Sequence, residues 1–189
     1  MSGYDVALFV HLVGAVTLFG GIAIQQAVAG RIRRAGTVQE IRQWMALLRP
    51  TGRMLPAAVV ILLISGLYMT AQRWTLRTPW VGTALLTLLA MAAVGATVLR
   101  RHFAALGRAS ALASDGAVSA EIARRQADAW AWGALSALNG AALGVVWLMT
   151  TKPAWGIAAG VVLGTAILAG LLGATFPVPG GRRASWMPQ

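Results

Sequence analysis

Hydrophobic residues follow one another along this chain in five long, nearly uncharged stretches rather than in short alternating groups. Each stretch holds about 20 residues, which is the length that an α-helix needs to cross the hydrocarbon core of a bilayer. Continuous apolar runs are typical of helical membrane proteins, whereas the strands of a membrane β-barrel alternate. The pattern predicts an all-α integral membrane protein, a five-helix bundle with spans at 5–28, 54–72, 79–99, 130–150 and 155–175.

Composition supports a membrane location. Of the 189 residues, 58% are hydrophobic and 11% are charged, and that charged fraction is roughly half of what a soluble domain carries. One bundle accounts for the whole length, so we expect a single transmembrane domain over residues 1–189. The chain has no cysteine, which excludes disulfides, thiolate metal sites and thiol catalysis.

The positive charges predict how the spans are threaded. Arg73, Arg77 and Lys152 follow the second and fourth spans, and the other cations all lie in segments on the opposite side: Arg31, Arg33, Arg34, Arg42, Arg49, Arg53, Arg100, Arg101, Arg108, Arg124, Arg125, Arg182 and Arg183. By the positive-inside rule the N-terminus is expected outside and the C-terminus in the cytoplasm. These arginines flank apolar runs, which favours contact with anionic lipid and argues against nucleic acid as the partner of a chain with net charge +11.

The segment 37–49 between the first two spans has its own helical pattern. Thr37 and Glu40 have the spacing of a capping box, and apolar residues then recur at helical spacing, namely Val38, Ile41, Met45 and Leu48. We expect a short helix in the cytoplasmic interface. It is either a packed connector with a lipid-facing stripe or the docking site of a protein partner.

The remaining cytoplasmic segments carry weaker signals. The second inner loop, about 101–129, is expected to turn at Ser114–Gly116, and a helix should run from Ser119 into the fourth span. The proline and glycine residues of segment 177–181 cannot continue a helix, so the tail is expected to be loose.

Small residues repeat every four positions in the last two spans. The fourth span has Ser136, Gly140 and Gly144, and the fifth has Gly156, Gly160 and Gly164. Small residues at this spacing let helix backbones approach closely in a membrane. We favour contact inside the terminal hairpin over dimerisation, and on that interpretation Gly160→Leu would damage folding.

His11 is the candidate for chemistry, because the cores of the five spans contain no other ionisable residue. It lies about 10 Å below Tyr4 at 1.5 Å per residue. Ser65 and Thr87 should lie at a comparable depth, and Asn139 slightly deeper. A neutral imidazole could simply hydrogen-bond one of these groups and hold the helices together. Alternatively, His11 could bind a cofactor or metal while these side chains fix its tautomer.

Other ligands in the chain are less favourable. His102 lies on the order of 20 Å below His11 along the membrane normal, so one metal ion cannot reach both residues. Thioethers are available from Met69, Met91 and Met149, but their sequence spacing shows no paired Met motif, which gives a copper relay little support.

The segment Ala7–Ala15, ALFVHLVGA, followed by Gly20–Gly21, resembles the first helix of the CopD-like group of bacterial membrane proteins. That group takes in the copper-resistance protein CopD, the DUF2269 proteins and the HemJ-type protoporphyrinogen oxidases. The size and the arginine-rich inner loops are most similar to DUF2269. The resemblance implies a bacterial inner membrane and, from the HemJ-type relatives, a haem b ligand at His11. Those relatives also use an intramembrane lysine, whereas the lysine here, Lys152, lies in an outer loop, which argues against the oxidase activity.

Three functional hypotheses follow. The first is a redox or metal-handling membrane protein in which His11 binds haem b or a metal, with Ser65, Thr87 or Asn139 as partners of the imidazole. The second is a non-catalytic structural or assembly subunit that docks a larger membrane complex through segment 37–49. The third is a solute channel whose constriction is the outer polar layer.

Overall fold

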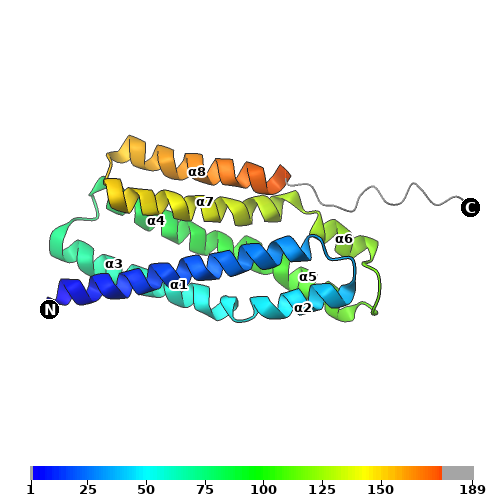
Figure 1. The fold of residues 1–189 in the computed structure, drawn as a ribbon. Coiled ribbons are helices and arrows are strands. Elements are labelled where there is room, and N and C mark those ends of the chain that lie inside the picture. Colours follow the sequence, from blue (N-terminus) through cyan, green and yellow to red (C-terminus); the bar gives the residue numbers. More distant parts are fainter. Residues whose placement is uncertain (1, 176–189) are drawn as a thin grey trace, which may run out of the picture.

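The computed structural model describes residues 2–175, and these fold into helices connected by short loops (Figure 1). Five helical segments are long and apolar enough to cross a membrane, which confirms the five expected spans for the described part of the chain. The elements are α1 (Gly3–Ile32), α2 (Val38–Leu48), α3 (Thr51–Arg73), α4 (Pro79–Val94), the π-helical segment η1 (Gly95–Leu99), α5 (Arg100–Leu112), α6 (Ala120–Gln126), α7 (Ala129–Thr151) and α8 (Trp155–Thr175).

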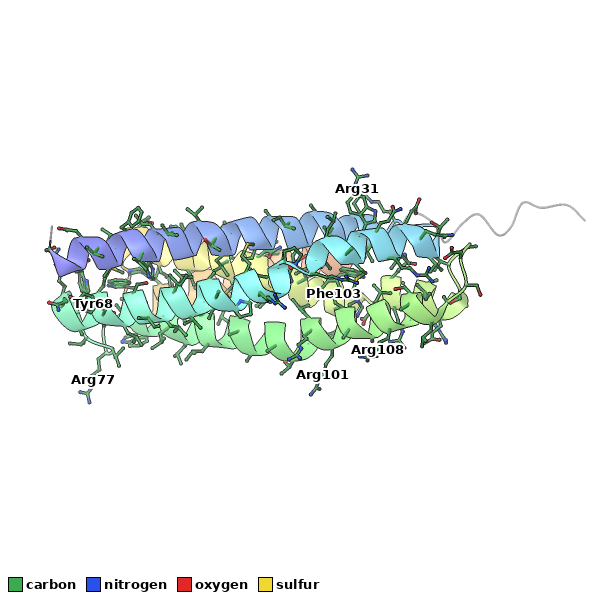
Figure 2. All side chains as sticks on the ribbon, turned by 90° about the horizontal axis from the view of Figure 1, so that it is seen from below. Arg31, Tyr68, Arg77, Arg101, Phe103 and Arg108 are labelled. Carbon is green, nitrogen blue, oxygen red and sulfur yellow. The ribbon has the colours of Figure 1, made fainter. Side chains whose placement is uncertain are left out.

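The long helices lie side by side in an elongated bundle, with α1 against α3 and α7 against α8 (Figure 1). Helix α4 contacts α3, α7 and α8 and so connects the two pairs. We call the end with Ser2 and the α3–α4 and α7–α8 loops the amino end, and the end with α2, α5 and α6 the basic end. Figure 2 shows Arg31, Arg101 and Arg108 projecting outward from α1 and α5, and Arg77 projecting at the amino end.

The basic end holds the largest hydrophobic core, which joins α1, α2, α5, α6 and α7. Ile32, Ile41 and Leu106 are each fully buried there. Buried Gln126 donates from Nε2 to the carbonyl oxygens of Ile32 at 2.7 Å and Ala35 at 3.1 Å. The Ala35 carbonyl, just beyond α1, gains a donor in this way, and the Ile32 carbonyl gains a second donor beside the Ala35 amide at 3.3 Å. The basic end is therefore fastened by polar as well as apolar contacts.

The stripe of α2 is buried inside the chain and does not face lipid. Val38 and Ile41 are 1% and 0% exposed and belong to the basic-end core. Thr37 caps the helix as expected, accepting from the Glu40 amide at 3.3 Å, while the Glu40 carboxylate accepts from the Gly36 amide at 2.9 Å. The expected lipid-facing stripe is therefore wrong, because this face packs against α1 and α5 in the basic-end core. A partner at segment 37–49 would have to bind the opposite face.

The α7–α8 hairpin is packed closely, but by a different face of α8 than the sequence suggested. Gly140 and Gly144 of α7 lie against α8, and Ser136 lies against Gly173. Around Gly156, Gly160 and Gly164 there is open space, since an added Cβ would meet no atom within 4 Å. The expectation that these three glycines pack inside the hairpin is wrong. The face of α8 that packs in the hairpin instead carries Thr165 and the buried residues Ala158 and Val162.

Helix boundaries differ at the basic end. The third span continues through η1 and α5 to Leu112, because Phe103 and Leu106 pack into the core beyond the apolar run. The helix expected from Ser119 into the fourth span is interrupted, since Asp128 Oδ1 accepts from the amides of Trp130 and Ala131 and starts α7 anew. Gly116 has the positive φ of 131° that the expected turn needs. The expectation for segment 177–181 falls outside the described residues.

Candidate functional site

His11 is half-buried on α1, and its side chain contacts α3. Its Nδ1 lies 3.0 Å from Ser65 Oγ. The Ser65 hydroxyl proton is used elsewhere, because Oγ donates to the Ile61 carbonyl at 2.6 Å. A serine hydroxyl has one proton to donate, so this geometry favours the tautomer in which Nδ1 carries the imidazole proton and donates to Ser65. In that tautomer Nε2 carries the lone pair.

A small residue makes room for this ring. At Gly66 an added Cβ would lie 3.3 Å from His11 Cε1 and 3.6 Å from Nδ1. Any larger residue there would press on the imidazole. The sequence analysis did not predict a role for Gly66. Its position directly after Ser65 was the available indication.

His11 lines a chamber of about 510 Å³ in the amino-end half of the bundle. The chamber lies between the α1–α3 pair on one side and α4 with α7 on the other, and its wall is mainly aliphatic. This volume falls within the range of small-molecule and cofactor sites, which are typically apolar with a few polar groups. The chamber thus combines an apolar enclosure with one imidazole.

Aromatic and cationic groups surround the chamber at the amino end. Trp74 and Trp80 meet edge to face with ring centroids 5.2 Å apart, and both line the chamber. Lys152 Nζ lies 5.0 Å from the Trp74 ring centroid, and the Arg73 guanidinium lies 4.0 Å from that of Tyr4. Lys152 and Tyr4 also line the chamber, so its amino end has an amphipathic rim with positive charge.

The three methionines that the sequence offered as thioether ligands also line this chamber, namely Met69, Met91 and Met149. They come from α3, α4 and α7. Their sequence spacing gave no sign of a common site because they lie on different helices. The fold brings them to the same enclosure as His11.

The other expected partners of His11 bond elsewhere. Thr87 Oγ1 donates to the Thr83 carbonyl at 2.7 Å, and Asn139 Nδ2 donates to Gln26 Oε1 at 2.7 Å. Threonine hydroxyls in membrane helices often bond the carbonyl one turn earlier. Of the three proposed partners, the structure brings Ser65 to the imidazole.

His102 lies in a separate environment at the basic end. Its Nδ1 is 3.3 Å from Asp128 Oδ2, and its ring meets Phe103 and Trp132 edge to face. Its side chain is 9% exposed, so the ring is largely covered by this aromatic cluster. It does not line the His11 chamber.

A family described as predicted integral membrane proteins, DUF2269, matches residues 5–153. The chain belongs to this family. The match takes in α1 beyond its first two residues, and it includes His11, Ser65 and Lys152, while α8 lies beyond it. This DUF2269 protein matches no curated protein and no solved structure. Family membership and the five apolar helices together make it an integral, multi-pass membrane protein.

Proposed function

We propose that this DUF2269 protein binds haem b in the amino-end chamber, with His11 Nε2 as an axial ligand, and serves a redox or metal-handling role in the bacterial inner membrane. The observation that carries the proposal is the 3.0 Å contact between His11 Nδ1 and Ser65 Oγ on the wall of the chamber. With the proton on Nδ1 and donated to Ser65, Nε2 would be the coordinating atom. This is the arrangement in which a second hydrogen bond orients a ligating histidine.

The chamber residues fit a haem group. Haem brings four nitrogen ligands of its own, so the protein has to supply only the axial positions. A thioether from Met69, Met91 or Met149 would complete a His/Met pair. The carboxylates of haem b would suit the positive rim, where Lys152 lines the chamber and Arg73 stacks on Tyr4. Bound haem would supply one-electron chemistry, and the chain would hold the group, orient it and exclude water.

The resemblance of the first helix to the CopD-like group supports the same assignment, since its HemJ-type members ligate haem b through this histidine. The distribution of arginines supports a cytoplasmic basic end. In that orientation the chamber lies in the outer half of the membrane.

One observation favours a second candidate. An imidazole and three thioethers line the same chamber, and ligands of this soft kind favour Cu(I). The chamber is larger than an ion needs, so we rank haem first. The two candidates separate in a titration of the purified protein with haem and, independently, with Cu(I) against a chromophoric chelator.

The test is an absorption spectrum of the protein titrated with haem in detergent, with Ser65→Ala as the informative variant. It removes the acceptor of Nδ1 and should weaken haem affinity by roughly 10- to 100-fold. Thr87→Val is the matched control, because the Thr87 hydroxyl donates to a carbonyl of its own helix, and this variant should bind haem like the wild type.

His11→Ala should abolish the Soret band while the far-UV circular dichroism stays unchanged. A Soret band that survives in His11→Ala would refute ligation by His11. A wild-type protein that binds neither haem nor Cu(I) would refute both candidates and leave the assembly subunit as the better hypothesis.

A further inference from the structure

A second pocket, of about 380 Å³, lies between α1, α7 and α8 on the side of the molecule away from α3. It shares no lining residue with the His11 chamber. It extends from Gln26 on α1 to Arg34, two residues beyond the end of that helix, a length of about 12 Å at the helical rise. One end of the pocket is therefore at the arginine-rich level of the bundle, and the other reaches into the apolar part of the spans.

One end of this pocket is lined by two arginines, Arg33 and Arg34. Arg33 donates from Nη1 to the Gly173 carbonyl at 3.0 Å, and its guanidinium lies 5.3 Å from the Trp132 ring centroid. These contacts fix its position beside the opening. Exposed Arg34 lines the same pocket. The described residues that line the pocket include no Asp or Glu.

The inner end carries amide groups between apolar walls. Asn139 Nδ2 donates to Gln26 Oε1 at 2.7 Å, and Gln26 Nε2 donates to Ser136 Oγ at 3.4 Å. Gln26 lies two helical turns, about 10 Å, from Arg33 along α1. Leu135 and Leu172 line the pocket beside these groups. A small soluble anion would use only the arginines and would leave this apolar wall uncovered.

From this arrangement we propose a specific binding site for an anionic diacyl phospholipid. The phosphate binds between Arg33 and Arg34, the ester groups lie toward the Gln26–Asn139 amides, and one acyl chain covers the wall at Leu135 and Leu172. The order of groups in the pocket matches the order in the lipid, from charge through polar linkage to hydrocarbon. The site is independent of the His11 chamber, so it stands whether or not haem binds there.

Glycine positions on α1 allow a clean test. Gly30 lines the pocket, and an added Cβ there meets no atom within 4 Å. Gly30→Leu should therefore fill the pocket without disturbing the fold. Gly20→Leu is its matched control, since Gly20 is also exposed on α1 with open space around it and lies outside both pockets. For charge, Arg34→Gln is compared with Arg31→Gln, because Arg31 is exposed but does not line the pocket.

The measurement is native mass spectrometry of the detergent-purified protein titrated with phosphatidylglycerol or with phosphatidylcholine of the same acyl chains. We expect one phosphatidylglycerol bound in preference to phosphatidylcholine. Gly30→Leu should lose this lipid and Gly20→Leu should keep it. Arg34→Gln should weaken binding by about five-fold, and Arg31→Gln should leave it unchanged.

Three results would overturn the proposal. The first is equal retention of phosphatidylglycerol by Gly30→Leu and the wild type, which would place bound lipid elsewhere. The second is equal binding of the two lipids. The third is displacement of the lipid by millimolar inorganic phosphate, which would assign the arginine end to a soluble anion.

Discussion

Gly140 and Gly160 allow the packing of the last two helices to be tested with one chemical change at two positions. Each would be replaced by alanine, on α7 and α8 respectively. At Gly140 the new methyl group would lie 2.7 Å from the Ala169 Cβ and 2.8 Å from the Thr165 carbonyl carbon. At Gly160 the same methyl group would meet no atom within 4 Å. The two positions thus share the substitution and differ in whether a neighbouring helix occupies the space.

The expected difference in unfolding free energy follows from this geometry. Replacing glycine by alanine in a helix gains up to about 1 kcal/mol from backbone entropy, and both variants share that gain. Overpacking a methyl group into a filled site costs about 1–3 kcal/mol. The atoms that crowd Gly140 include the α8 backbone, which cannot rotate away as a flexible side chain can. We therefore expect Gly140→Ala to be the less stable of the two by about 3 kcal/mol.

The assay is reversible unfolding in mixed micelles by increasing the fraction of SDS, followed by far-UV circular dichroism. Gly140→Ala should unfold at a clearly lower SDS fraction than the wild type, and Gly160→Ala at an equal or higher one. The reasoning fails if both variants unfold at the same midpoint. It also fails if Gly160→Ala is the weaker, because that would mean the open face of α8 is buried against another molecule.

Two further outcomes can be measured on the same preparation. Gln126→Leu should lower the free energy of unfolding by about 1 kcal/mol, since it removes the donor to the Ala35 carbonyl and one of the two donors to the Ile32 carbonyl. In the same SDS titration, a midpoint equal to that of the wild type would contradict this. The chain has no cysteine, so single cysteines at Thr75 and Asp115 report topology directly. An impermeant maleimide added to intact cells should label Thr75→Cys and not Asp115→Cys, and the reverse pattern would invert the predicted orientation.

The spans were predictable because the cost of placing polar backbone and charge in hydrocarbon depends only on position along the chain. What the sequence could not specify is which side of each helix faces protein. A stripe such as Val38 and Ile41 is equally apolar whether it meets lipid or a neighbouring helix, and here it is buried in the basic-end core. The glycines of α8 show the same ambiguity. Small residues spaced by four positions form a flat helix face. The spacing does not indicate whether another helix covers that face.

The candidate site was predictable to the same extent. Depth alone placed Ser65 near His11, and the structure brings these two side chains together. Depth also grouped Thr87 and Asn139 with them, but rotation about each helix axis turns those side chains toward Thr83 and Gln26. The chamber could not be predicted because its wall comes from helices that are distant in sequence. No local sequence pattern indicates how far apart those helices lie in the fold.

The two ends of the bundle are held in different ways, and this difference bears on how a ligand would reach His11. At the basic end, buried side chains from α1, α2, α5, α6 and α7 interlock, and Gln126 bonds the carbonyls that end α1. At the amino end the α1–α3 pair is separated from α4 and α7 by the chamber. Regions with less buried contact open at lower free energy than the core. Separation of the two helix groups at the amino end would therefore leave the basic-end core intact, and an apolar ligand could enter between them from the bilayer without unfolding the protein.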